Sequence, residues 1–230
     1  MKTGIIISGG WTDARLCKDV IDAYNGRKEL RGIRRPEGTE KPELIAADRG
    51  LLTCRAMGVK PDYIVGDFDS ADDPHLKTET ITLPVAKDDT DSVYALKEGM
   101  KRGFREFLLI GVIGMRLDHT LVNTYSLILL CNHGCHGMIV DDYSEIELIT
   151  GSPERSGYAS VSGEYPFFSL VAIEGTASGV SIRDAKFCLE DACIHPYYQF
   201  ATSNEVLPGR TAQISIKDGK LLLIRVLSEL

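Results

Sequence analysis

The sequence lacks any long hydrophobic run. Its longest stretch of large apolar residues, 127–131, is far shorter than the roughly 18 residues that a membrane-spanning helix needs. Before a glycine pair, the N-terminus places only Ile5, Ile6 and Ile7 in a row, whereas a signal peptide has an apolar core of about 7–15 residues. These absences predict a soluble, cytoplasmic protein.

Cysteines are too few for a disulfide framework, six in 230 residues, and we expect free thiols in a reducing compartment. Cys131, His133, Cys135 and His136 resemble zinc ligands at first sight. Their C-x3-C spacing, however, has no second ligand pair at a conventional distance. We therefore favour buried small side chains and helix-end residues over a metal site here.

The sequence also has no surplus of basic residues. It contains 26 Lys and Arg and 33 Asp and Glu, which gives a net charge of −7. This balance argues against a broad basic face for nucleic acids. The segment 61–92 contains nine acidic and two basic residues, which accounts for the whole imbalance. The glycine motifs of P-loop, dinucleotide-binding and protein-kinase type do not occur. The acidic segment therefore needs another explanation.

Short apolar runs alternate with amphipathic stretches up to residue 143. We expect helices at 12–24, with Thr12 as the N-cap, and at 50–57, 90–102 and 120–131. The expected strands are 4–8, 44–47, 63–65, 80–83, 106–112 and 138–140. Strand–helix alternation is typical of parallel pairing. Residues 1–143 are therefore predicted to form an open, mainly parallel α/β sheet domain.

Helical periodicity disappears from residue 144 onward. Short strand-like runs follow at 146–149, 158–161, 167–173, 180–182, 211–216 and 221–226. Asp218-Gly219 separates the last two runs and is a strong hairpin signal. Residues 144–230 are therefore predicted to form a smaller, all-β domain of the sandwich type.

Charged side chains follow four of the expected strands, where open α/β sheets bind their ligands. These residues are Asp48, then Asp67 and Asp69, then Asp88 and Asp91, and finally Arg116, Asp118 and His119. Carboxylates that share one edge repel each other unless a cation lies between them. Mg²⁺ is the hard cation that binds carboxylates, waters and substrate phosphates together. With helix N-termini and an arginine nearby, the pattern predicts a polyphosphate site.

Helix capping is the simpler explanation for some of these residues. Asp88, Thr90 and Asp118 stand where helices are expected to begin, and Asp and Thr are common N-caps. Capping alone does not explain why carboxylates follow successive strands in order. We therefore favour the functional interpretation.

Several motifs occur in a fixed order along nearly the whole chain. They are Ala47-Asp48, Gly66-Asp67-Phe68-Asp69-Ser70, Lys87-Asp88-Asp89-Thr90-Asp91, Gly111–Gly114, Arg116-Leu117-Asp118-His119, Asn123 and Ser203-Asn204-Glu205. Together they resemble the thiamine pyrophosphokinase family. The resemblance implies Mg²⁺-dependent transfer of pyrophosphate from ATP to the hydroxyl of thiamine, which gives thiamine diphosphate and AMP. It also implies a homodimer with active sites at the subunit interface.

The resemblance implies a different role for each domain. Residues 1–143 would bind ATP and catalyse the reaction, and residues 144–230 would bind thiamine and dimerise. Mg²⁺ is assigned to Asp67, Asp69 and Asp91, of which Asp67 or Asp91 would also orient or deprotonate the hydroxyl. Arg116 would stabilise phosphate charge. The expected substrate contacts are Asp48, Asp88, Asp118, His119 and Asn123, with Ser203 and Asn204 on the thiamine side.

Two residues depart from the family pattern. Arg49 and Met115 stand where the family often has glycine, and both lie beside expected ligand loops. A bulky side chain at either position would alter nucleotide preference or loop shape.

Other functions fit parts of the same pattern. An Mg²⁺-dependent phosphohydrolase would use water as the nucleophile, and a related pyrophosphokinase would act on another hydroxymethyl heterocycle such as a pterin. A nucleotide- or thiamine-sensing module would bind without turnover, but it needs no metal cluster. The acidic cluster fits a phosphohydrolase or a pterin pyrophosphokinase as well as it fits a thiamine pyrophosphokinase.

Overall fold

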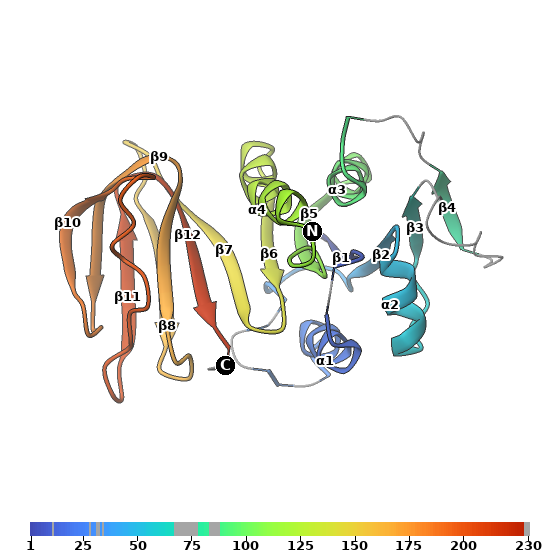
Figure 1. Cartoon of the computed structure of the whole chain (residues 1–230), viewed down its shortest axis with the longest axis horizontal. Helices are drawn as coiled ribbons and strands as arrows, with labels where there is room; N and C mark the ends of the chain where they lie inside the picture. The colour runs from blue at the N-terminus through green and yellow to red at the C-terminus, as the bar shows by residue number, and fades with distance from the viewer. Residues whose placement is uncertain are drawn as a thin grey trace. The chain divides into compact units, whose positions relative to one another are not determined.

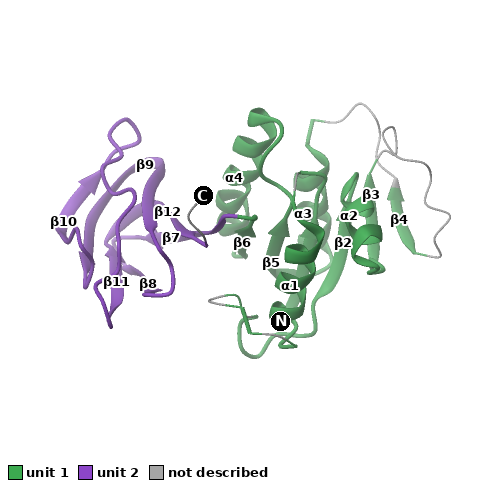
Figure 2. Ribbon diagram, turned by 60° about the horizontal axis from the view of Figure 1, so that its bottom comes forward, with its two compact units in different colours: residues 1–142 green, residues 143–230 purple. Residues whose placement is uncertain are grey.

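The computed structural model describes residues 1–10, 12–27, 29–30, 33, 35–66, 78–82 and 88–227. The chain divides into two compact units, Met1–Asp142 and Tyr143–Leu230 (Figure 2). This division lies one residue before the expected boundary. No helix in the described part of the chain is long and apolar enough to cross a membrane.

Parallel strands form the sheet of the first unit, in the order β4-β3-β2-β1-β5-β6 (Figure 1). Their bounds are β1 Lys2–Ile7, β2 Glu43–Ala47, β3 Tyr63–Gly66, β4 Glu79–Thr82, β5 Phe104–Ile110 and β6 His136–Val140. The central strands β1, β2 and β5 are almost continuously apolar and buried, as expected for strands covered on both faces. The predicted parallel α/β sheet is confirmed.

Helices connect these strands and cover the sheet. They are α1 Ala14–Tyr24, α2 Gly50–Met57, α3 Asp91–Lys101 and α4 Leu117–Asn132. From β1, the strands β2, β3 and β4 follow one another toward one edge of the sheet. The strands β5 and β6 lie on the other side of β1. Because such crossovers are right-handed, α1 and α2 lie on one face and α3 and α4 on the opposite face (Figure 1).

The N-cap of α1 differs from the prediction by one residue. Asp13, not Thr12, is the N-cap, and its carboxylate accepts a hydrogen bond from the Leu16 amide at 2.9 Å. The Thr12 hydroxyl instead donates to the Asp142 carboxylate at 3.1 Å. The sequence pattern predicted that the Thr12 hydroxyl caps the helix. In the structure this hydroxyl bonds instead to Asp142, which is distant in sequence.

The second unit contains antiparallel strands in the order β7-β12-β9-β11-β8, with β10 paired to β9. Their bounds are β7 Ser144–Gly151, β8 Gly157–Ser162, β9 Phe168–Arg183, β10 Leu189–Ile194, β11 Thr211–Ile216 and β12 Asp218–Val226. The strand β9 belongs to two sheets, since its first half pairs with β12 and its second half with β11 and β10. The predicted all-β unit of the sandwich type is confirmed.

The predicted hairpin at Asp218-Gly219 is wrong. In the described structure β11 pairs with β8 and β9, and β12 pairs with β7 and β9, so the two strands are not partners. Gly219 has a φ of 100°, and a Cβ there would lie 2.7 Å from the Thr176 carbonyl oxygen. This glycine therefore permits a close crossing over β9 as the chain changes sheets.

Candidate functional site

A pocket of about 230 Å³ lies at the carboxyl ends of the central strands of the first unit. The strand order reverses at β1, which lies between β2 and β5, and such a reversal opens a crevice for ligands. The pocket is lined by loops that follow β1, β2 and β5, by the first turn of α3 and by the first two turns of α4. It brings together Asp48, Asp91, Arg116, His119 and Asn123 from the predicted site.

Two glycines allow the loops after β1 and β5 to touch. The Gly10 amide donates to the Gly111 carbonyl oxygen at 2.7 Å. A Cβ on Gly10 would lie only 2.4 Å from that oxygen, and Gly111 itself has a φ of 66°. Glycine is therefore needed at both positions to form this side of the pocket.

Asp48 adopts a strained backbone conformation at the end of β2. Its φ is 46°, in the left-handed region that L-residues rarely occupy. The Asp48 amide donates to the Val65 carbonyl oxygen at 2.8 Å, which fixes the strained turn against β3. One oxygen of its carboxylate is buried. Strain of this kind persists where the surrounding structure enforces it, commonly at binding sites.

Asp91 stands in the first turn of α3, directly after the N-cap. The N-cap is Thr90, as the sequence allowed, and its hydroxyl accepts from the Val93 amide at 3.3 Å. The next residue, Ser92, is buried and shares a 2.8 Å hydrogen bond with the hydroxyl of Ser8 at the end of β1. These contacts tie the start of α3 to the centre of the sheet and so fix Asp91 in the pocket.

The pocket carboxylates fit a hard cation. Asp48 and Asp91 both line the pocket, and each has one buried carboxylate oxygen. Mg²⁺ takes one or two carboxylates and completes its octahedron with waters and phosphates. Within the described residues, His, Cys, Asp and Glu form no group of three or more that could hold a metal by itself. Asp67 and Asp69, which were predicted to share this metal with Asp91, lie outside the described residues.

Arg116 and Asp118 form an exposed ion pair at the start of α4. The Arg116 Nε donates to one carboxylate oxygen of Asp118 at 3.1 Å and Nη2 donates to the other at 2.5 Å. The guanidinium lowers the pKa of Asp118 to about 2, and the carboxylate in turn raises the pKa of Arg116. Arg116 lines the pocket and Asp118 does not. Asp118 therefore holds the arginine at the pocket's edge.

Asn123 lines the pocket and has an unsatisfied buried acceptor. Its side chain is buried on the inner face of α4, and Nδ2 donates to the Val112 carbonyl oxygen at 2.7 Å. Its Oδ1 atom is buried with no hydrogen-bond partner among the described residues. A buried acceptor without a donor is costly, so a ligand group that donates an N–H or O–H is expected there. His119 lines the same pocket one helical turn earlier.

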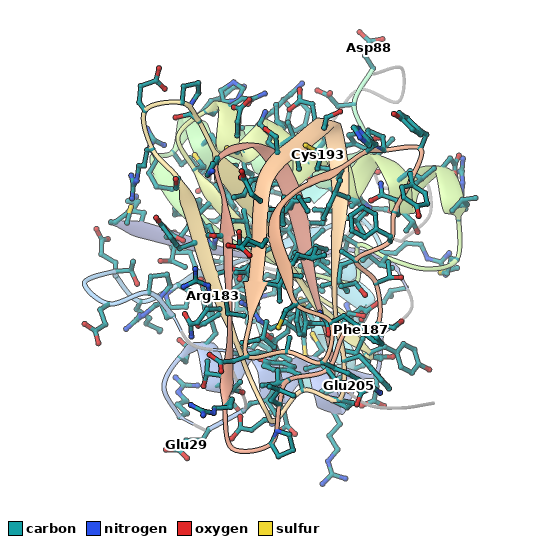
Figure 3. The ribbon with its side chains drawn as sticks, turned by 90° about the vertical axis from the view of Figure 1, so that its left-hand side faces the viewer. Glu29, Asp88, Arg183, Phe187, Cys193 and Glu205 are labelled. Atoms are coloured by element: carbon teal, nitrogen blue, oxygen red, sulfur yellow. The ribbon has the colours of Figure 1, made fainter. Side chains whose placement is uncertain are left out.

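Asp88 lies apart from this pocket. It is exposed and does not belong to the lining, and Figure 3 shows its carboxylate directed away from the ribbon. A direct substrate contact of Asp88 stays a prediction that the described geometry does not support.

Ser203 and Asn204 belong to the second unit, where Asn204 has a structural role. The Asn204 Oδ1 atom accepts from the Phe187 and Glu205 amides at 3.0 Å each, and Nδ2 donates to the Phe187 carbonyl oxygen at 2.8 Å. Figure 3 shows Phe187 and Glu205 toward the same end of this unit. Ser203 is exposed, with a φ of 54°. Asn204 thus fixes the loop, and Ser203 is left accessible.

Three members of the cysteine and histidine group near residue 133 contact protein groups. The Cys135 thiol is buried and contacts the Phe104 carbonyl oxygen at 3.8 Å. His133 is hydrogen-bonded to the Leu129 carbonyl oxygen, and His136 to Glu106. The described partners of these side chains are therefore protein groups.

The pocket also contains residues outside the predicted site. Ser8 and Ser92 form the bond described above, and Arg49 and Met115, which the sequence placed beside the ligand loops, line the pocket with exposed side chains. Met115 also has a left-handed φ of 60°. The unusual residues Arg49 and Met115 were visible in the sequence as departures from a pattern, but Ser8 and Ser92 carried no signal because they meet only in three dimensions.

Two family models match the chain. One, described as the catalytic domain of thiamin pyrophosphokinase, matches residues 39–139. The other, described as the vitamin B1 binding domain of thiamin pyrophosphokinase, matches residues 158–221. The two ranges lie within the first and second compact units respectively. No significant match was found among curated proteins.

Solved structures share the fold over the whole chain. A thiamine pyrophosphokinase from Bacillus subtilis has a TM-score of 0.77 at 21% identity and covers 99% of this chain and 100% of its own. A thiamin pyrophosphokinase from Geobacillus thermodenitrificans has a TM-score of 0.74 at 22% identity, covering 100% and 98%. One from Candida albicans has a TM-score of 0.72 at 16% identity, covering 98% and 89%. At these identities the likeness establishes the shared fold.

Proposed function

Since this chain belongs to the thiamin pyrophosphokinase family, we propose that the pocket at the carboxyl ends of β1, β2 and β5 is where pyrophosphate passes from ATP to thiamine. The thiamine hydroxyl attacks the β-phosphorus of ATP and loses its proton. The bond between the β-phosphorus and the oxygen bridging to the α-phosphate breaks, and AMP leaves. The observation that carries this assignment is that two carboxylates, two arginines and Asn123, whose Oδ1 atom is buried without a described partner, line one pocket.

The acidic residues of the pocket would hold Mg²⁺. Asp91 and Asp48 lie in the lining, and Asp67 and Asp69 follow β3 directly in sequence. A bound Mg²⁺ would neutralise phosphate charge and align the β-phosphorus for in-line attack. A carboxylate of Asp91 or Asp67 would accept the proton of the hydroxyl.

The start of α4 would bind the nucleotide. Arg116, held by Asp118, offers its positive charge to the phosphates. The Asn123 Oδ1 atom accepts a hydrogen bond from the adenine amine or a ribose hydroxyl, and His119 lines the same part of the pocket. The helix N-terminus adds a favourable potential for an anion.

Thiamine recognition is assigned to the second unit. The model matching 158–221 is described as binding vitamin B1. Within that range Ser203 is exposed, and Asn204 fixes its loop. We also propose a homodimer that places an active site at the subunit interface, and a cytoplasmic location, where ATP and Mg²⁺ are supplied. Sedimentation equilibrium tests the dimer, because it predicts twice the 25.3 kDa of one chain, and a monomer at assay concentrations would contradict it.

The acceptor is identified by a substrate panel. Purified protein is incubated with ATP and Mg²⁺ and with thiamine, a hydroxymethylpterin or no acceptor, and nucleotides are separated by chromatography. We expect AMP and thiamine diphosphate in equal amounts with thiamine alone. AMP formation only with the pterin would reassign the acceptor. Nucleotide hydrolysis at the same rate without an acceptor would show a phosphohydrolase.

A further inference from the structure

Arg49 lines the pocket but has no role in the proposed binding of Mg²⁺, ATP or thiamine. It lies between the strained Asp48 and the first residue of α2, and its exposed side chain lines the pocket. Among the described residues, its guanidinium has neither an ion pair nor a helix-capping hydrogen bond. Arg116, by contrast, is paired with Asp118. Arg49 therefore brings to the pocket a positive charge that no described carboxylate neutralises.

The backbone at Arg49 is held tightly from several sides. The Asp48 amide is bonded to the Val65 carbonyl oxygen at 2.8 Å. Gly50 lies so close to β1 that a Cβ would approach the Ile7 carbonyl oxygen to 2.0 Å, and a Cβ on Gly9 would lie 2.6 Å from the Arg49 Cβ. The origin of the side chain is thus fixed, which lowers the entropic cost of binding a ligand with it.

The substrate needs such a charge. ATP brings several negative charges to a pocket that already contains the carboxylates of Asp48 and Asp91, and one divalent cation neutralises only part of this total. A guanidinium offers paired N–H donors that match phosphate oxygens. We propose that Arg49 binds the polyphosphate chain of ATP as a second cation beside Arg116. This inference rests on the proposed function of the pocket and adds a donor-binding residue to it.

The test compares Arg49 with an arginine of the same helix. Arg49→Gln removes the charge and keeps a polar side chain of intermediate length, and Arg49→Lys keeps the charge without the planar fork. Arg55→Gln is the matched control, because Arg55 is exposed in the last turn of α2 and does not line the pocket. Calorimetry with Mg²⁺ and inorganic tripolyphosphate measures binding without turnover. Steady-state kinetics give KM for MgATP and for thiamine separately.

Arg49→Gln is expected to weaken tripolyphosphate binding and to raise KM for MgATP by about tenfold or more, the loss typical of a charge-assisted hydrogen bond. KM for thiamine should stay within about twofold, Arg49→Lys should lose less, and Arg55→Gln should match the wild type. Equal binding of tripolyphosphate and MgATP by wild type and Arg49→Gln would overturn the inference. If instead the wild type forms no AMP from ATP and thiamine, the proposed function itself fails, whatever Arg49 does.

Discussion

Backbone strain among the described residues lies partly at the pocket. Asp48 and Met115 are pocket residues with left-handed φ angles of 46° and 60°. Such conformations cost free energy in a residue with a Cβ, of the order of 1–3 kcal/mol each. The sequence identified the importance of Asp48 through its position after a strand. It did not predict the strain, because φ depends on contacts such as the bond to Val65.

Buried thiols give a prediction at the same scale. Burial raises the pKa of Cys17 and of Cys54 from 9.0 to about 12, so both remain protonated and unreactive at pH 8. The exposed Cys188 and Cys193 should react with iodoacetamide in the folded protein, as mass spectrometry of peptides would show. Alkylation of Cys17 or Cys54 as fast as that of Cys188 would contradict the structure.

The same two thiols predict how stability depends on pH. Above pH 9 the unfolded chain releases protons that the folded chain retains up to about pH 12. The free energy of unfolding should therefore fall between these values, by up to roughly 1.4 kcal/mol per pH unit for each thiol. Urea titrations at pH 8 and pH 10.5 measure the fall, and Cys54→Ala should make it shallower. An equally steep fall in that variant would rule out the thiol as its cause.

At the scale of elements, periodicity predicted the helices and parallel strands of the first unit because each buries a regular apolar pattern. It failed where the outcome depends on distant partners. Asp218-Gly219 has hairpin chemistry, yet β9 lies between β11 and β12. The strand β10 was not predicted at all, because its Leu-Glu-Asp-Ala-Cys-Ile sequence is half-exposed and does not alternate.

The glycines at the two ends of α2, its first residue Gly50 and its C-cap Gly58, give a prediction about this helix. Gly50→Ala would place a Cβ 2.0 Å from the Ile7 carbonyl oxygen, whereas at the C-cap Gly58, with a φ of 66°, a Cβ meets nothing within 4 Å. We expect Gly58→Ala to cost about 1 kcal/mol, the left-handed penalty alone. Gly50→Ala should cost about 3 kcal/mol or more, because backbone must move. Chemical denaturation measures both, and equal losses would contradict the packing of α2 on β1.

At the scale of the whole molecule, the acidic excess that segment 61–92 shows in the sequence is partly explained. Asp91 lies in the pocket, and Asp62 accepts a hydrogen bond from the Leu44 amide at 2.8 Å, which fixes the entry to β3. Asp89 is paired with Lys97, and Glu79 with Arg102. The sequence predicted which strand ends carry chemistry, because parallel strands place their carboxyl ends at one edge. The resemblance also assigned Asp91 and not Asp89 to the site, and the pocket lining contains only Asp91 of the two.

That neighbouring pair provides the most direct test of the central claim, that the pocket is the site of pyrophosphoryl transfer. Asp91→Asn and Asp89→Asn each remove one charge at the start of α3, but only Asp91 lines the pocket. The measurement is the rate of thiamine-dependent AMP formation by both variants, with thermal unfolding as the check on folding. We predict that Asp91→Asn loses activity by at least about a hundredfold, while Asp89→Asn keeps activity near the wild-type rate. Wild-type activity in folded Asp91→Asn would contradict the account.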